Sequence, residues 1–383
     1  MEISADVNPQ ELWRALFDPA RSRDALRELK KQAHAENSEA QWHLANWLSY
    51  SSTKGFQHPS KVSAAWLLRA ADHGYLPAMV DAGHYLETTK GPDADPARAE
   101  TLYRSAARRG SALAAWALGL NAEANFGPQA NSERAYRWFH RAAELDSALG
   151  WKPGEYALAG IVEGREAAEG LKLLESAAHT GRSAEAEFYM GLAEYLGLRG
   201  NVDPHSAKDW FKRSASNALS YSTELGERCA HALLGRLLAF SQRTRTEGIQ
   251  HLEIAASVGL PLAQVELALA SLILGETWTK CSKLLRKAVQ SYSKSWRQPG
   301  TIWLGVEFLT LERIELASDL LGQSGRAKEV SEFHRFAQGF NAKPSMQGAR
   351  RGQKRLSAHS ASPRGAQTRG ASPKRAAHAT RKH

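Results

Sequence analysis

Residue types that could support catalysis do not form a known motif in this 383-residue chain. There is no HExxH zinc motif, no Walker-type Gly-Lys-Ser/Thr loop, no GxSxG and no GxGxxG. The fourteen histidines are scattered. His73, His179 and His251 fall near expected helix ends or on a repeated face, where solvation or the helix dipole accounts for them. We therefore predict no catalytic, cofactor-binding or metal-binding residues, and a protein that is not an enzyme.

Cysteine usage and the start of the chain bear on the compartment. The two cysteines, Cys229 and Cys281, form no CxxC pair, so neither a disulfide framework nor a zinc site is expected, and a reducing compartment fits. The start, Met1 to Asp18, mixes acidic with apolar residues and lacks the basic and apolar regions of a secretory signal. No stretch approaches the roughly 20 apolar residues that span a membrane. We expect a cytoplasmic protein without a transmembrane segment.

The residues that could bind a polyanion are concentrated at the C-terminal end. The formal net charge is +10, yet residues 341–383 hold eleven basic residues and no Asp or Glu. No aromatic residue lies among them for stacking on bases, so binding to nucleic acid would be non-specific. An acidic protein, an anionic membrane surface or a purely solubilising role are the alternatives. The candidate polyanion-binding residues are Arg350, Arg351, Lys354, Arg355, Arg364, Arg369, Lys374, Arg375, Arg381 and Lys382.

The eleven tryptophans are the third candidate set. Three of them occupy the same position of a sequence repeat, which favours a role in packing between helices: Trp66, Trp138 and Trp210. Three others lie where the repeat is irregular, and we predict that they offer exposed aromatic contacts to a partner: Trp151, Trp278 and Trp296.

The elements that position these residues follow one recurring pattern, in which an apolar residue is followed, four residues later, by a small pair. It begins with Trp66, Ala70 and Ala71. The first small residues of the successive copies are Ala70, Ala106, Ala142, Ala177, Ser214, Ala255 and Ala288. Their spacing of 33 to 41 residues, with a typical period of about 36, is the mark of a stacked repeat protein.

A second pattern, a small residue followed four and five positions later by a small or apolar residue and Gly, runs in register with the first. One copy is Ala78, Ala82 and Gly83. Each unit is thus a helical hairpin, with expected helices near Ala78–Thr88 and from Pro96 to Gly110. Asp95 is placed to cap the second helix, Pro96 suits its first position, and Gly110 can end it.

These residues resemble the Sel-one-like repeat (SLR), a branch of the tetratricopeptide-like helical repeats. The resemblance is carried by the small-xxx-apolar-Gly pattern, the Gly-x-x-Asp-Pro loop and the helix with the small pair, and it covers about residues 40–278. It implies an all-α fold, a right-handed α-solenoid of stacked hairpins, whose concave face binds other proteins.

We divide the chain into four parts. Residues 1–39 form an N-terminal helical cap, 40–274 the repeat solenoid, 275–340 degenerate repeats with a C-terminal cap, and 341–383 a disordered basic tail, because the tail has too little apolar surface to fold. Two connections are expected to be lengthened, at Ala148–Tyr156 and at Asn217–Cys229.

The leading prediction for function is a non-enzymatic protein-interaction scaffold or adaptor that holds a protein or peptide on the concave face. The alternative is a nucleic-acid-associated protein, in which the tail binds DNA or RNA and the solenoid recruits a protein.

Overall fold

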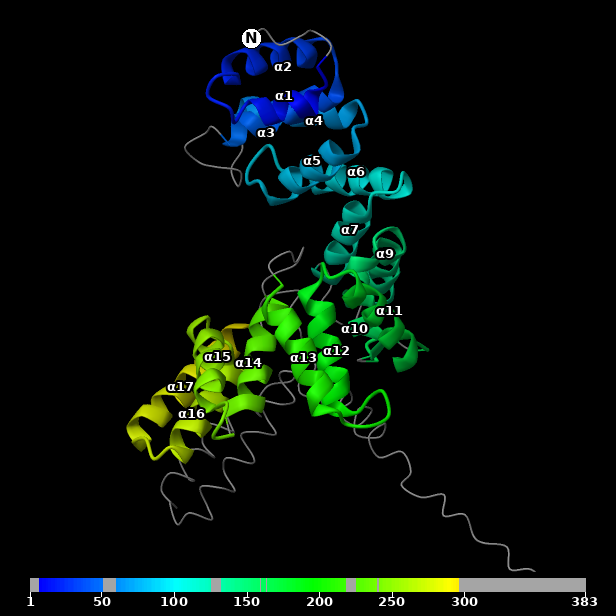
Figure 1. Ribbon diagram of the computed structural model, residues 1–383. Coiled ribbons are helices and arrows are strands. Elements are labelled where there is room, and N and C mark those ends of the chain that lie inside the picture. Colours follow the sequence, from blue (N-terminus) through cyan, green and yellow to red (C-terminus); the bar gives the residue numbers. More distant parts are fainter. Residues whose placement is uncertain are drawn as a thin grey trace, which may run out of the picture.

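The computed structural model describes residues 7–50, 60–124, 132–158, 160–162, 164–217, 225–239 and 241–295. Within these ranges the chain is an α-solenoid of helices stacked in pairs, with no β-strand (Figure 1). This confirms the predicted fold class for the described part. The predicted disordered tail, 341–383, lies outside the described residues.

Two N-terminal helices are followed by seven helical pairs in the described part of the chain. The N-terminal helices are α1 (Pro9–Ala15) and α2 (Ser22–His34). The first helices of the pairs are α3 (Ser38–Tyr50), α5 (Leu76–Thr88), α7 (Ala112–Ala124), α10 (Trp151–Leu158), α12 (Ala184–Leu196), α14 (Leu225–Ala239) and α16 (Pro261–Ile273). The second helices are α4 (Lys61–Asp72), α6 (Pro96–Arg108), α9 (Ser132–Leu145), α11 (Ala167–His179), α13 (Pro204–Ala215), α15 (Arg245–Ser257) and α17 (Trp278–Ser295).

The starts and ends of helices follow the predicted capping residues. The Asp95 carboxylate accepts the backbone N–H of Arg98 at 2.9 Å, and Pro96 is the first residue of α6. Asp203 caps α13 in the same way, accepting the backbone N–H of Ser206 at 3.0 Å. Side-chain acceptors of this kind satisfy N–H groups that have no partner within the helix.

In three pairs, a glycine of the first helix is the point where the second helix comes closest. A Cβ at Gly119 of α7 would lie 2.5 Å from the Phe139 ring of α9, which explains why only glycine fits. The same contact, with a residue twenty positions later, occurs at Gly83 with Tyr103 and at Gly191 with Phe211. The shared spacing sets the register of these three hairpins.

The connection predicted at Ala148–Tyr156 is instead a helix of the array. A short 3-10 helix, η1 (Ser147–Gly150), leads directly into α10, and Gly154 packs on Leu174 of α11 as the other repeat glycines pack on their partners. Pro153 stands in the first turn of α10, where a missing N–H costs nothing. The predicted loop was wrong because Pro and Gly, which often mark loops, here serve a helix start and a close contact.

The first helices form the inner row of the array. α12 contacts both α10 and α14, and α14 also contacts α16. Comparable contacts between successive second helices are missing throughout the described ranges. Helices on the inner side of a curved stack are closer together than those on the outer side, so the first helices line the concave side, and the second helices form the outer row.

The last described pair spans residue 274, after which degenerate repeats are predicted. Helix α17 packs on α16 there. At the other end, α1 and α2 both pack on α3. The connection predicted to be long at Asn217–Cys229 includes residues 218–224, which lie outside the described residues, as do residues 296–340.

Candidate functional site

The sequence-predicted partner contacts do not come together in a site. Trp151 is only 4% exposed and packs 5.5 Å from Trp116 of α7, so it is a core residue and not an exposed aromatic contact. The prediction failed because Trp151 belongs to a regular first helix. Trp278 is the first residue of α17, and its side chain lies outside the described part, as do Trp296 and the entire basic tail.

The three tryptophans at the common repeat position lie on second helices and are half-buried. Trp66 of α4 packs on His34 of α2 with ring centroids 5.0 Å apart, and Trp210 of α13 packs on His179 of α11 at 6.2 Å. Trp66 and Trp210 therefore each bridge the gap to the preceding outer helix, as the packing role predicted for them requires, and Trp138 packs against the core cluster of the earlier repeats.

In the middle of the inner row, helix α12 is covered on all sides. Ten consecutive residues of α12, from Ala184 to Ala193, are all buried, including two glutamates, Glu185 and Glu187. A helix of the array normally keeps one face exposed. No face of this part of α12 is therefore free to receive a partner.

A buried polar cluster joins α7, α10 and α12 on this inner side. The Lys152 ammonium is 1% exposed and lies 3.3 Å from Glu123 and 3.2 Å from Glu155. The Tyr156 hydroxyl donates to Glu123 at 2.7 Å, and the Tyr189 hydroxyl donates to Glu155 at 2.6 Å. Each tyrosine thus bonds to a glutamate of the preceding first helix.

The ionisation states in this cluster argue against catalysis. Burial lowers the pKa of Lys152, but the two carboxylates more than compensate, and its pKa is raised. Burial and the glutamates raise the pKa of both Tyr156 and Tyr189. A permanently charged lysine and protonated phenols neither take up nor release protons near neutral pH, so the cluster is a structural junction.

Helix α7, which precedes α10 in the inner row, has an apolar stripe that is partly exposed. The stripe consists of Leu113, Trp116, Ala117 and Leu120, which share one face of the helix because they are spaced by three, four and seven residues. Leu113 is 54% and Leu120 is 38% exposed, while Trp116 and Ala117 are half-buried. Within the stripe, Trp116 packs on Phe139 of α9 at 4.9 Å and on Trp151 of α10 at 5.5 Å, which leaves the two leucines as its exposed members.

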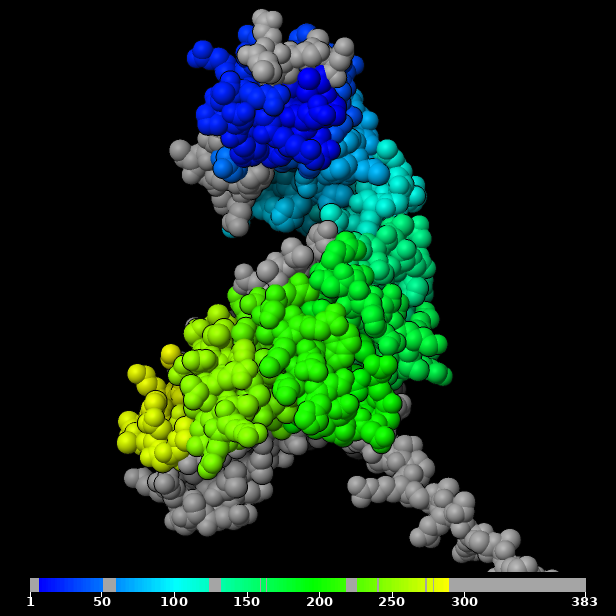
Figure 2. Space-filling view, in the orientation of Figure 1, coloured from blue at the N-terminus to red at the C-terminus, as the bar shows by residue number. Residues whose placement is uncertain are grey.

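The position of α7 places this stripe where the array bends. In Figure 1, α1 to α6 lie on one side of α7 and α12 to α17 on the other. Figure 2 shows that the surface is hollowed between the N-terminal helices and the green helices of the later repeats. Exposed leucines on a concave surface are the usual basis for binding a protein segment.

Helix α5 is held to α3 by a side-chain hydrogen bond. The Trp42 indole N–H of α3 donates to the Asp81 carboxylate of α5 at 2.7 Å, and burial raises the pKa of Asp81. The neighbouring His84 is exposed on the same helix face as Asp81. This face of α5 is therefore polar.

The sequence held a signal for the stripe that our sequence reasoning missed. The α7 segment, ALAAWALGLNAEA, is apolar on every side, and such a helix is either fully covered or leaves an apolar face exposed. The segment of Lys152 and Glu155, WKPGEYAL, gave no such signal, because its residue types are those of a solvated loop.

Metal and membrane sites have no support in the described part of the structure. No group of three or more His, Cys, Asp or Glu side chains there could hold a metal ion. None of the described helices combines the length and apolar character that crossing a membrane requires.

The stacked helical hairpins place the chain in the class of tetratricopeptide-like α-solenoids. Comparison of its sequence with family models finds repeats of one family within this class. The family model of the Sel1 repeat matches residues 38–75, 76–111, 112–147 and 184–219. These are the pairs α3–α4, α5–α6, α7–α9 and α12–α13. The chain therefore contains four Sel1 repeats, and proteins with such repeats are generally scaffolds that bind protein partners.

Solved structures show the same fold. A protective antigen of uropathogenic Escherichia coli with an SLR fold is 18% identical, with a TM-score of 0.57 over 95% of this chain and 82% of that chain. A Sel1 repeat protein from Oxalobacter formigenes is 22% identical, with a TM-score of 0.54 over 66% of this chain and 100% of that chain. No curated protein matches the sequence.

The pair α10–α11 lies between matched pairs, and the Sel1 family model does not match it. It carries Lys152 and Glu155, two members of the buried polar cluster. This pair therefore departs from the family pattern where it lies next to the exposed stripe of α7.

Proposed function

We propose that this protein is a non-enzymatic interaction scaffold that binds a protein segment on the inner face of α7. The observation that carries the proposal is the apolar stripe, with Leu113 and Leu120 exposed on α7, a first helix of the repeat array. Burying two such leucines against a partner contributes roughly 1.5–3 kcal/mol each when burial is complete. The buried junction of Lys152 supports the proposal, because it holds α7 at a defined angle to the later repeats.

The test is a double charge substitution on the stripe, Leu113→Glu with Leu120→Glu. Tagged full-length protein is used to retain partners from a lysate of its own host. We expect the wild type to retain a defined set of proteins and the double variant to lose it, because a carboxylate in an apolar contact must be desolvated.

The matched control changes two exposed apolar residues of the outer row, Val62→Glu with Ile254→Glu. These side chains are 60% and 48% exposed, so the control alters charge and exposed surface to a similar degree. If the stripe variant retains the same proteins as the control, the inner face of α7 is not the binding site. If the folded wild type retains nothing, the scaffold proposal itself fails.

A second candidate function rests on the tail, whose eleven basic residues without Asp or Glu favour a polyanion. In this proposal the tail binds nucleic acid non-specifically while the solenoid holds a protein. Fluorescence anisotropy with labelled duplex DNA and RNA at several salt concentrations compares the full chain with a 1–340 truncation. Binding that needs the tail and falls steeply with salt supports this function, whereas equal behaviour of the two chains contradicts it.

We also propose that the protein is cytoplasmic. Cys229 and Cys281 are both buried and are not joined in a disulfide, which is compatible with the reducing environment of the cytoplasm.

A further inference from the structure

A groove opens in the outer row between α15 and α17, far along the chain from α7. In earlier pairs, Trp66 and Trp210 bridge the gap between successive second helices. On α17 the same repeat position is taken by Leu284, which fills less of the gap than an indole would. The smaller side chain is one physical reason why the gap remains open there.

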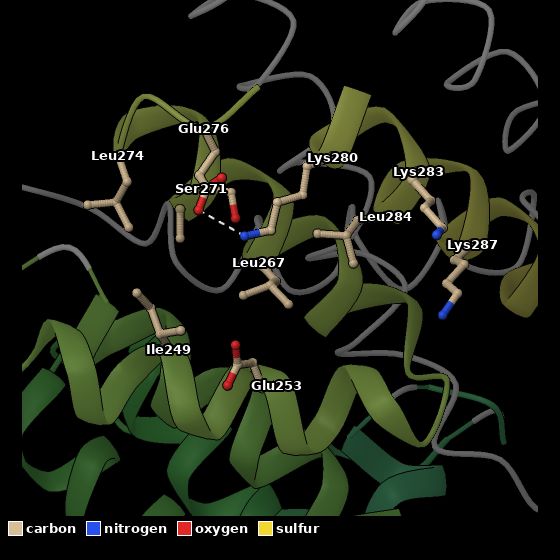
Figure 3. A pocket seen from close by; sticks show the side chains of 11 residues that line it. Ile249, Glu253, Leu267, Ser271, Leu274, Glu276, Lys280, Lys283, Leu284 and Lys287 are labelled. Atoms are coloured by element: carbon tan, nitrogen blue, oxygen red, sulfur yellow. Dashed lines mark hydrogen bonds and ion pairs between the residues drawn. The ribbon is translucent and has the colours of Figure 1, made fainter. Parts of the chain in front are cut away.

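The groove is apolar inside and has a volume of about 370 Å³ (Figure 3). Ile249 of α15 and Leu284 of α17 form its walls, and Leu267 and Leu274 of α16 line its floor. No aromatic side chain is among the described residues that line it. The interior therefore suits aliphatic side chains.

The rim of the groove carries charge. Lys283 and Lys287 are exposed, stand one turn apart on α17, and have no ion-pair partner in the described part of the chain. Lys280 lies on the same wall but is held by Glu276 at 2.8 Å. Glu253 of α15 stands on the opposite wall, as Figure 3 shows.

We propose that this groove binds an acidic amphipathic helix of a partner protein. Aliphatic residues at spacings of three and four would enter the groove, as in other helix-in-groove complexes. Acidic residues one turn apart on one flank would pair with Lys283 and Lys287, and a basic residue on the other flank would meet Glu253. The groove lies in the outer row and so adds a second binding surface to the scaffold.

Nucleic acid fits this groove poorly. Its aliphatic interior offers bases no ring to stack on, and Glu253 would repel phosphates. A ligand can contact the lysines of the rim and the leucines of the interior together only if it carries acidic and aliphatic side chains on adjacent faces. A helix with this pattern satisfies both requirements at once.

The probe for the test is a fluorescent synthetic helix with leucines at positions i, i+3, i+4 and i+7 and glutamates along one flank. Its control is the same peptide with lysine in place of each glutamate. Binding to the full-length protein is followed by anisotropy. We expect the acidic peptide to bind at least about tenfold more tightly than the basic one at low salt.

Two variants of the groove decide whether the peptide binds there. Lys283→Glu with Lys287→Glu should weaken the acidic peptide by about tenfold or more and strengthen the basic one, because each change converts an attraction into a repulsion. Leu284→Trp restores the residue type of Trp66 and Trp210, so it should fill the groove and abolish binding while the fold is kept. The control Lys30→Glu with Lys61→Glu makes the same change of net charge elsewhere and should have no effect.

Four outcomes would overturn the proposal. The acidic peptide could fail to bind the full chain, or it could bind all variants equally. A fatty acid such as myristate could displace the peptide completely, with an affinity that the lysine substitutions leave unchanged. That result would indicate a site for small amphiphiles. The chain's own residues 311–321 carry acids at the same spacing as Lys280, Lys283 and Lys287, namely Glu312, Glu315 and Asp319. If changing these three to lysine raises the affinity for the peptide, this segment of the chain is the occupant.

Discussion

At the scale of single residues, the buried histidines are groups whose protonation opposes folding. His43 lies between Trp13, on which its ring stacks at 5.5 Å, and Trp42, whose tilted ring is 4.9 Å away, and burial lowers its pKa to about 4. His231 and His251 face each other with their Nδ1 atoms 2.7 Å apart, and burial lowers the pKa of both. One of these two rings must be neutral to accept the hydrogen bond from the other.

The lowered pKa values predict a loss of stability in mild acid. The unfolded chain binds protons near the ordinary histidine pKa of about 6.5, whereas the folded chain does not until a lower pH. The free energy of unfolding should therefore be unchanged above pH 7 and fall as the pH decreases from about 6.5 towards 4, with roughly 3 kcal/mol from His43. Urea denaturation at pH 7.5 and pH 5 measures this difference.

His43→Phe keeps a ring between the two tryptophans but cannot be protonated, so it should reduce the dependence on pH. Changing the exposed His205 to Phe is the control and should leave that dependence intact. A wild-type stability that is the same at pH 7.5 and pH 5 would contradict the role assigned to these histidines.

At the scale of elements, the buried polar cluster fixes how α7, α10 and α12 meet. Removing two charges from water costs several kcal/mol per ion, which close pairing and hydrogen bonds must offset. Here one ammonium lies between two carboxylates, and two tyrosine hydroxyls complete the network. Such a junction tolerates few alternative arrangements of the three helices.

Lys152→Met is therefore expected to destabilise the protein by about 3–5 kcal/mol, because it removes the ammonium partner of Glu123 and Glu155. Adding Glu123→Gln and Glu155→Gln to this variant should recover much of the loss, since neutral amides cost less to bury. Thermal and urea unfolding of the single and triple variants check this. A Lys152→Met protein as stable as the wild type would show that the pairing contributes nothing.

At the scale of the whole molecule, the array is a line of nearest-neighbour contacts whose strength varies along its length. The middle repeats are joined both within pairs and between first helices, from α10 to α16. In α12, ten consecutive residues are buried, while α6, a helix of the same 13 residues in length, keeps one face in solvent. Stability in repeat arrays follows such local differences.

Hydrogen exchange should reveal this gradient. We expect the backbone amides of α12 to exchange at least about tenfold more slowly than those of α6, because opening α12 disrupts contacts on all its faces. Mass spectrometry of peptides that cover the two helices provides the comparison within one sample. Uniform exchange along the array would mean that it unfolds as a single unit, against the expectation from its contacts.

The extent to which sequence predicts this protein depends on how local each interaction is. The hairpins, the caps at Asp95 and Asp203 and the pairing of repeat glycines with large side chains could all be anticipated, or read from spacing, because they involve residues at constant separations. The resemblance to the Sel1 repeat also follows, because the period and the pattern of small residues are read directly from the sequence. These features need no knowledge of how one repeat is rotated against the next.

Only the tertiary structure decided which side chains are covered by neighbouring helices. Lys152 is a buried charge, while Leu113 and Leu120 remain exposed, although residue type alone favours the opposite for all three. Trp151 is a core residue, although its place at an irregular joint of the repeat favoured exposure. The gap beside Leu284 likewise depends on the distance between two outer helices. The stacking angle between repeats determines exposure at each position, and a repeating sequence pattern does not encode that angle position by position.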